Sequence, residues 1–166
     1  MPGYYEYLLS SLPMLTFGMK APLSFERLIT LCKGMIPDQD IAVVRSVVAP
    51  AGILCGEIRN KTLARWYSFE TMLRNEFVMI RAARKKTDAT KYLRRDGCPE
   101  SAHAAHIAIN AYRKPSLMES ERALDQERWQ ELDELARGHY FDVDSVIIYA
   151  CKLLILEKWD RINAAD

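Results

Sequence analysis

The chain has 166 residues, of which 49% are hydrophobic and 27% are charged. This composition is ordinary for a folded protein and argues against extensive disorder. The length predicts a single domain over residues 1–166, with two lobes, 1–55 and 56–166, as the alternative. The formal net charge of +1 gives no overall attraction to nucleic acid or to a membrane surface. The four cysteines form no Cys-x-x-Cys pair, which is typical of reduced thiols in a cytoplasm rather than of a disulfide framework.

The sequence predicts neither a signal peptide nor a membrane span. Residues 1–15 carry Glu6 and lack a basic start before their apolar run, unlike a secretory signal. The most apolar stretch, residues 146–156, has eleven residues and is interrupted by Lys152, whereas a helix needs about 20 apolar residues to cross a bilayer. We therefore expect a cytoplasmic protein that associates with a membrane only through its partners.

The first third of the chain predicts two short helices after an aromatic segment. Residues 4–9 are rich in tyrosine, so a short strand or an extended segment is expected there. Ser24 is a suitable N-cap for a helix that Gly34 ends, and a second helix begins near Asp38. Proline and glycine residues between 49 and 56 then predict a turn-rich linker.

The middle of the chain predicts one long helix and two shorter ones. Between the N-cap Asn60 and about Lys86, apolar residues recur at helical spacing and form one face: Leu63, Trp66, Phe69, Leu73, Phe77 and Ile80. Asp88 then caps a short helix that reaches about Leu93. An alanine-rich helix is expected over residues 101–111.

The last third predicts two further helices. Ser116 and Glu119 have the spacing of a capping box, which opens a helix to Gly138. Asp142 caps a final helix over residues 143–163, whose middle is apolar nearly all round and is therefore expected at the centre of the fold. The fold class predicted from these elements is all-α, a compact multi-helix bundle of about seven helices with little or no sheet.

A phosphate-binding loop is disfavoured. Residues 56–62 resemble such a loop, but Asn60 stands where a glycine is needed for the backbone to approach phosphate. No local signature of a catalytic nucleophile is present either. The sequence therefore predicts no catalytic residue and no cofactor.

A metal site is also disfavoured. Glu100, His103 and His106 have a spacing that could present one carboxylate and two imidazoles on a helix face. Helical dimetal sites need further carboxylates and a second Glu-x-x-His motif, and the only other histidine is His139. We expect no metal, and a metal-dependent helical enzyme built on these residues is kept as an alternative.

Two charged residues fall on the apolar side of the helix over residues 116–138. Its stripe of leucines consists of Leu117, Leu124, Leu132 and Leu135. Glu121 and Arg128 lie within this stripe and are about 10 Å apart along the axis, too far to pair directly. Each needs a partner on another element, because an unpaired buried charge is costly.

The long helix provides partners for these charges, and we expect a network that fixes helix packing. Arg128 should pair with Glu70, and Glu121 should pair with Arg74 or Arg81. A paired-carboxylate active site is the alternative explanation. Asp125 is placed at the edge of the network, whose members are Glu70, Arg74, Arg81, Glu121, Asp125 and Arg128.

The charges are also segregated along the chain. Residues 56–98 hold eleven basic and five acidic residues, a net charge of +6, whereas residues 116–145 hold three and nine, a net charge of −6. These segments either neutralise each other or form opposed docking surfaces. The long helix has a basic end that suits its dipole and could also bind an acidic partner. RNA binding is disfavoured because no aromatic stacking motif accompanies this basic end, which comprises Arg81, Arg84, Lys85 and Lys86.

Three blocks of sequence together resemble a known family. The first block begins at Tyr4-Tyr5-Glu6-Tyr7-Leu8 and includes Ser11-Leu12-Pro13 and Phe17. The second is Trp66 to Glu76 with Arg81-Ala82, and the third runs from Glu121 through Gly138-His139-Tyr140-Phe141-Asp142 to Leu153. Together they resemble a bacterial family of uncharacterised proteins that are encoded among V-type ATPase subunits. That family is similar to the V-type ATPase C subunit, called d in eukaryotes, which is an all-helical funnel.

The resemblance implies a mechanical role without chemistry. The C/d subunit seats the central stalk on the membrane ring and carries torque between them, so the implied partners are stalk and ring subunits of a proton- or sodium-transporting ATPase. That subunit has three repeated helical units, and 166 residues are too few for all three. A shortened adapter, an assembly factor or an oligomer are each compatible with the resemblance. A generic helical adaptor unrelated to rotary ATPases is the remaining alternative.

Overall fold

A computed structural model describes residues 3–48, 58–94 and 101–165. The contacts within the chain define two compact units, which we call unit 1 (Met1–Ala51 with Trp129–Asp166) and unit 2 (Gly52–Arg128). The boundary between Arg128 and Trp129 lies inside helix α6 (Leu117–Leu135). One continuous helix therefore contributes residues to both units.

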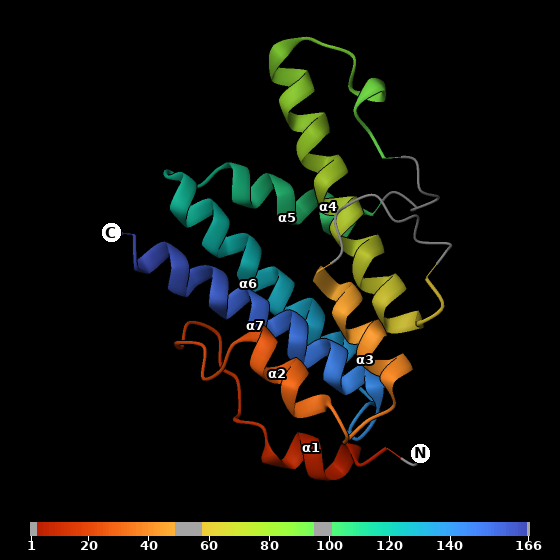
Figure 1. Cartoon of the computed structure of the whole chain (residues 1–166). Helices are drawn as coiled ribbons and strands as arrows, with labels where there is room; N and C mark the ends of the chain where they lie inside the picture. The colour runs from red at the N-terminus through yellow and green to blue at the C-terminus, as the bar shows by residue number, and fades with distance from the viewer. Residues whose placement is uncertain (1–2, 49–57, 95–100, 166) are drawn as a thin grey trace. The chain divides into compact units, whose positions relative to one another are not determined.

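Unit 1 is built around its C-terminal helix. Helix α7 (Val143–Asn163) is contacted by α1 (Tyr5–Ser11), α2 (Phe25–Cys32) and α3 (Asp38–Arg45), and by the 3-10 turn η1 (Ser46–Val48). Figure 1 shows α7, in blue, alongside the orange helices α2 and α3. Three short helices thus cover one long one.

Helix α7 is largely buried, as the sequence predicts, and it is central within unit 1. It begins and ends at the expected residues, and Asp142 caps it by accepting a hydrogen bond from the backbone N–H of Ser145. Burying apolar side chains on most sides of one helix is the main source of its stability, because an isolated helix is only marginally stable in water. The buried residues of α7 are Val146, Ile147, Ile148, Ala150, Cys151, Leu153, Ile155, Leu156 and Trp159.

The expectation of a strand or an extended segment at residues 4–9 is wrong, because Tyr5–Ser11 forms helix α1. The helix buries Leu8, which is 2% exposed, and brings the hydroxyl of Tyr5 to the carboxylate of Asp40 on α3. These tertiary contacts outweigh the weak local preference of tyrosine for strands.

Unit 2 contains the longest helix. Helix α4 (Lys61–Lys85) packs against α5 (Ala102–Tyr112) and against the 3-10 turn η3 (Ala89–Lys91). Asn60 caps α4 as expected, accepting a hydrogen bond from the N–H of Leu63 at 2.7 Å. The expected helix over residues 88–93 is only this 3-10 turn, which Asp88 caps.

The apolar faces of α4 and α6 are shorter than the sequence periodicity suggests. On α4, Phe77 and Ile80 are half-buried, whereas four other members of the expected face are buried. On α6, the first leucine of the stripe, Leu117, is 79% exposed. The buried members are Leu63, Trp66, Phe69 and Leu73 on α4, and Leu124, Leu132 and Leu135 on α6.

The fold class predicted from the sequence is confirmed. The described ranges contain seven α-helices and no strand, apart from one isolated bridge between Lys33 and Ile36. Within these ranges, no helix is both long and apolar enough to span a bilayer. The expected turn-rich linker over 49–56 lies outside the described residues. Whether units 1 and 2 act as a single domain stays a prediction.

Candidate functional site

An arginine with two carboxylates connects α4 to α6 within unit 2. Arg128 on α6 donates from Nε to Oε1 of Glu70 on α4 at 2.7 Å, and from Nη2 to the other oxygen of Glu70 at 3.3 Å. Its Nη1 donates to Oδ1 of Asp125, one turn earlier on α6, at 2.9 Å. The structure thus contains the ion pair between Arg128 and Glu70 that is expected from the sequence.

The environment of this network makes the arginine a permanent cation. Burial alone would lower the pKa of Arg128, but the facing carboxylates of Glu70 and Asp125 outweigh burial and raise the pKa above its ordinary value. The side chain of Asp125 is only 2% exposed, against 22% for Arg128 and 30% for Glu70. A guanidinium that keeps its proton cannot act as a general acid or base, so this arrangement suits a packing or positioning role.

The structure also shows where other members of the expected network lie. Asp125, expected at its edge, is the most buried of the three paired residues, because it lies three positions before Arg128 and so on the same helix face. Arg74 is exposed and donates to the backbone carbonyl of Tyr92 at 3.4 Å. Arg81 is exposed, with its guanidinium 5.9 Å from the ring centre of Phe77. The pairing of Glu121 with Arg74 or Arg81 stays a prediction.

The basic end of α4 forms an exposed cationic surface. Arg81, Arg84, Lys85 and Lys86 are all exposed. Lys86 caps the helix in the left-handed conformation, with φ of 54°. Cations at a helix C-terminus are favoured by the helix dipole, by about 0.3–1 kcal/mol each at a surface. An acidic partner could reach this surface without displacing any part of unit 2 that the structure describes.

The two histidines of α5 are on its surface. His103 and His106 are both exposed, and Asn110 Nδ2 lies 3.3 Å from the ring nitrogens of His106. Glu100 lies outside the described residues, so a metal site on Glu100, His103 and His106 stays a prediction.

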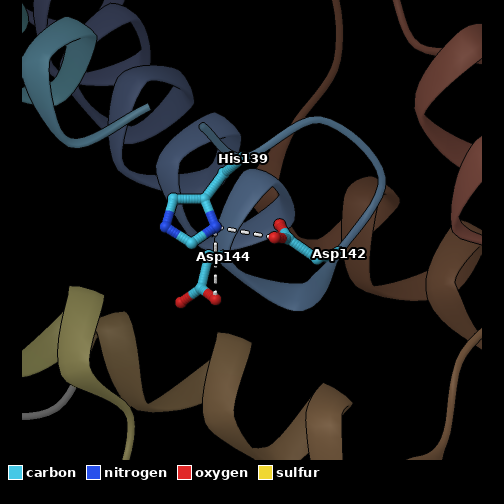
Figure 2. A group of neighbouring side chains, drawn as sticks. All are labelled: His139, Asp142 and Asp144. Carbon is cyan, nitrogen blue, oxygen red and sulfur yellow. Dashed lines mark hydrogen bonds and ion pairs between the residues drawn. The ribbon is translucent and has the colours of Figure 1, made fainter. Parts of the chain in front are cut away.

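A different histidine gathers two carboxylates in unit 1, and sequence reasoning missed it. His139 Nδ1 lies 2.6 Å from Oδ2 of Asp142 and 3.6 Å from Oδ2 of Asp144. The potential metal-ligand atoms of the three side chains all lie within 4.8 Å of one another. Figure 2 shows the imidazole ring facing both carboxylates, with dashed lines to each. The sequence signal was His-x-x-Asp-x-Asp, but only the turn between α6 and α7 brings its members together.

Local structure explains this convergence. Gly138 adopts a φ of +87°, a left-handed conformation that glycine adopts at no steric cost, and it turns the chain after α6. Asp142 then caps α7, because its Oδ1 accepts from the N–H of Ser145 at 2.8 Å and from the hydroxyl of Ser145 at 3.0 Å. Asp144 lies in the first turn of the helix.

Electrostatics keep Asp142 ionised. Its partial burial would raise the pKa, but the hydrogen bonds from His139 and Ser145 outweigh that effect and lower the pKa of Asp142 below its ordinary value. The side chains are partly accessible, with 33% of His139, 40% of Asp142 and 19% of Asp144 exposed. Water or a ligand can therefore reach the cluster.

Comparison with known proteins identifies a family for most of the chain. No curated protein and no solved structure matches it. A family described as "Protein of unknown function (DUF2764)" matches residues 54–165. This range includes the charge network around Arg128, the basic end of α4 and the cluster around His139. Because the match covers more than half of the sequence, the chain belongs to the DUF2764 family.

Proposed function

We propose that this chain is a non-catalytic subunit or accessory protein of a bacterial V-type rotary ATPase, linking the central stalk to the membrane ring. The proposal starts from the sequence blocks that resemble a family encoded among V-type ATPase subunits and, through it, the C/d subunit. The description of the DUF2764 family assigns no function, so the physical features of the two units provide the further support.

The observation that carries the proposal is the connection of α4 to α6 through Arg128, Glu70 and Asp125. A spacer between a turning stalk and a ring must transmit force without its helices sliding past each other. A two-point contact between a guanidinium and a carboxylate has a defined geometry, and a slide of one helix turn along its neighbour would separate the charges. Sliding would have to break this half-buried ion pair, and the energetic cost of breaking it resists the motion.

The exposed charges of unit 2 suit attachment through partners. The cationic end of α4 can bind an acidic surface of a stalk or ring subunit, with an on-rate and specificity set by charge complementarity. Peripheral attachment of this kind needs no membrane-spanning helix in the chain itself. The same features also fit a generic helical adaptor or an assembly factor, which would bind the ATPase transiently or not at all.

Affinity capture tests the proposal. The tagged chain is expressed in its native host, membranes are solubilised gently, and captured proteins are quantified by mass spectrometry. The proposal predicts V-type ATPase stalk and ring subunits in near-equal amounts with the bait. If stalk and ring subunits are captured in amounts far below that of the tagged chain, the result would favour an assembly factor. If none is captured from cells that express the ATPase, the proposal is overturned.

A charge reversal tests the surface separately. Arg84→Glu with Lys85→Glu should reduce capture of the partners at least tenfold, because both side chains are exposed at the C-terminal end of α4. The matched control is Arg113→Glu with Lys114→Glu, two consecutive exposed cations at the C-terminal end of α5. If both variants capture the partners equally well, the end of α4 is not the docking surface. The subunit role is tested separately, by capture with the unaltered chain.

A further inference from the structure

The turn between α6 and α7 gathers three side chains that the proposed function does not use. His139 comes from the turn itself, Asp142 from the N-cap of α7 and Asp144 from the first turn of that helix. Their ligand atoms converge although each residue comes from a different local structure. We propose that His139, Asp142 and Asp144 bind a divalent transition-metal cation of the Zn²⁺ or Mn²⁺ class. The inference is independent of the proposed role in a rotary ATPase.

The geometry is close to what such a cation needs. Zinc binds histidine nitrogen and carboxylate oxygen at about 2.0–2.2 Å, which places neighbouring ligand atoms about 3.0–3.6 Å apart. Nδ1 of His139 lies 3.6 Å from Oδ2 of Asp144 and 2.6 Å from Oδ2 of Asp142. To admit the cation, the separation of Asp142 from His139 must widen by about 0.4–1.0 Å, and the cation takes the place of the proton that now joins them.

The carboxylate of Asp142 is held in position for this role by its other oxygen. Oδ1 accepts two hydrogen bonds from Ser145, which leaves Oδ2 directed toward His139. Ligands that are oriented by hydrogen bonds behind them are a general property of protein metal sites. The same bonds cap α7, so one side chain both ends the turn and presents a ligand atom.

The charges and the donor types select the class of cation. The N-terminus of α7 contributes about half a positive charge, which opposes a cation, but the two carboxylates Asp142 and Asp144 outweigh it. One imidazole nitrogen with two carboxylate oxygens suits zinc, manganese or iron, whereas calcium and magnesium prefer oxygen ligands alone. The partial exposure of all three side chains leaves the remaining coordination positions to water or to a group from a partner.

The cation would cross-link the turn to the first turn of α7. This predicts a local structural effect, because coordination would add a bond between His139 and the helix to the contacts with Asp142 and Asp144. A ligand that binds only the folded state raises the unfolding temperature by mass action.

Calorimetric titration with Zn²⁺ tests the site, using untagged, metal-free full-length protein. One equivalent of Zn²⁺ should bind to the wild type and raise its unfolding temperature. His139→Gln and Asp144→Asn should each weaken binding at least tenfold and abolish the rise, and neither substitution removes the Asp142 cap. His106→Gln, which changes an exposed histidine on α5, is the matched control and should bind like the wild type.

Co²⁺ distinguishes this site from the thiols of the chain. Cobalt bound to His139 and the two aspartates should show d–d absorption without the charge-transfer band of a cobalt–thiolate bond. Absence of stoichiometric binding, retention of full binding in His139→Gln, or a thiolate band would each overturn the proposal.

Discussion

Arg128 and Glu70, which are 58 positions apart in the sequence, meet through two hydrogen bonds that run from one guanidinium to both oxygens of one carboxylate. The pair joins the two longest helices of unit 2, and Asp125 completes it from within α6. Such a contact fixes both the distance and the register of two helices, because both bonds depend on the same planar fork.

Removing the arginine should destabilise the protein strongly. Arg128→Ala leaves Asp125, whose side chain is 2% exposed, without its cationic partner, and we expect a loss of about 3 kcal/mol in the free energy of unfolding. Denaturant unfolding followed by circular dichroism measures it. The control is Arg137→Ala, which removes an exposed pair with Glu134 and should cost less than about 0.5 kcal/mol. Equal effects of the two substitutions would show that the Arg128 network does not stabilise unit 2.

The hydroxyl of Tyr5 should stabilise unit 1. Burial, followed by the hydrogen bond to Asp40, raises the pKa of Tyr5 above its ordinary value, so its hydroxyl donates throughout the neutral range. Tyr5→Phe leaves the carboxylate without this donor and should cost about 1–2 kcal/mol. Tyr7→Phe, on the same helix at 66% exposure, should leave stability within about 0.5 kcal/mol. If Tyr5→Phe leaves the free energy of unfolding unchanged, the hydrogen bond between Tyr5 on α1 and Asp40 on α3 does not stabilise unit 1.

The cap of α7 should make part of the stability dependent on pH. Because the folded state lowers the pKa of Asp142, its contribution is fully present above the ordinary aspartate value of about 3.9 and is lost as the pH falls through the lower folded value. Asp142→Asn keeps a capping side chain but removes this titration. Unfolding curves should therefore show that the wild type is more stable than Asp142→Asn at pH 6 and that the two are equally stable in acid. A difference in the free energy of unfolding that grows toward low pH would contradict the lowered pKa of Asp142.

The thiol of Cys32 should resist modification in the native protein. It is 0% exposed, and burial raises its pKa to about 11, so both access and thiolate content are low at pH 8. Maleimide labelling followed by mass spectrometry of the Cys32 peptide should show slow modification in buffer and fast modification in urea. Equal rates under both conditions would mean that α2 does not pack as described.

Local signals in the sequence were sufficient for most helices. Asn60, Ser101 and Asp142 each cap a helix that begins at the next residue, and their short polar side chains accept the first free N–H groups. The apolar pattern of α7 also predicted its central burial. Helix caps and apolar patterns depend only on residues that are close together in the sequence, so one sequence is sufficient to predict them.

The predictions from the sequence fail for residues whose partners are distant along the chain or whose position depends on an unusual backbone turn. Helix α1 contacts α7 and buries Leu8, and Tyr5 donates a hydrogen bond to Asp40 on α3. No local pattern of tyrosines predicts these tertiary contacts. The burial of Asp125, whose side chain is 2% exposed, depends on tertiary packing that the sequence alone does not reveal. The convergence of His139 with Asp144 depends on the turn that Gly138 opens, so the spacing His-x-x-Asp-x-Asp is not sufficient by itself to predict a site.

Purification of the ATPase itself tests most directly whether this chain is one of its subunits. A V-type ATPase is isolated from native membranes through a tag on another of its subunits, and this chain is quantified by mass spectrometry against the stalk subunits. If this chain is a subunit of the ATPase, it should stay at a fixed ratio to the stalk subunits through every purification step. The ratio should fall when Arg84 and Lys85 are both changed to glutamate. An intact, fully coupled ATPase that contains none of this chain would rule out the subunit role.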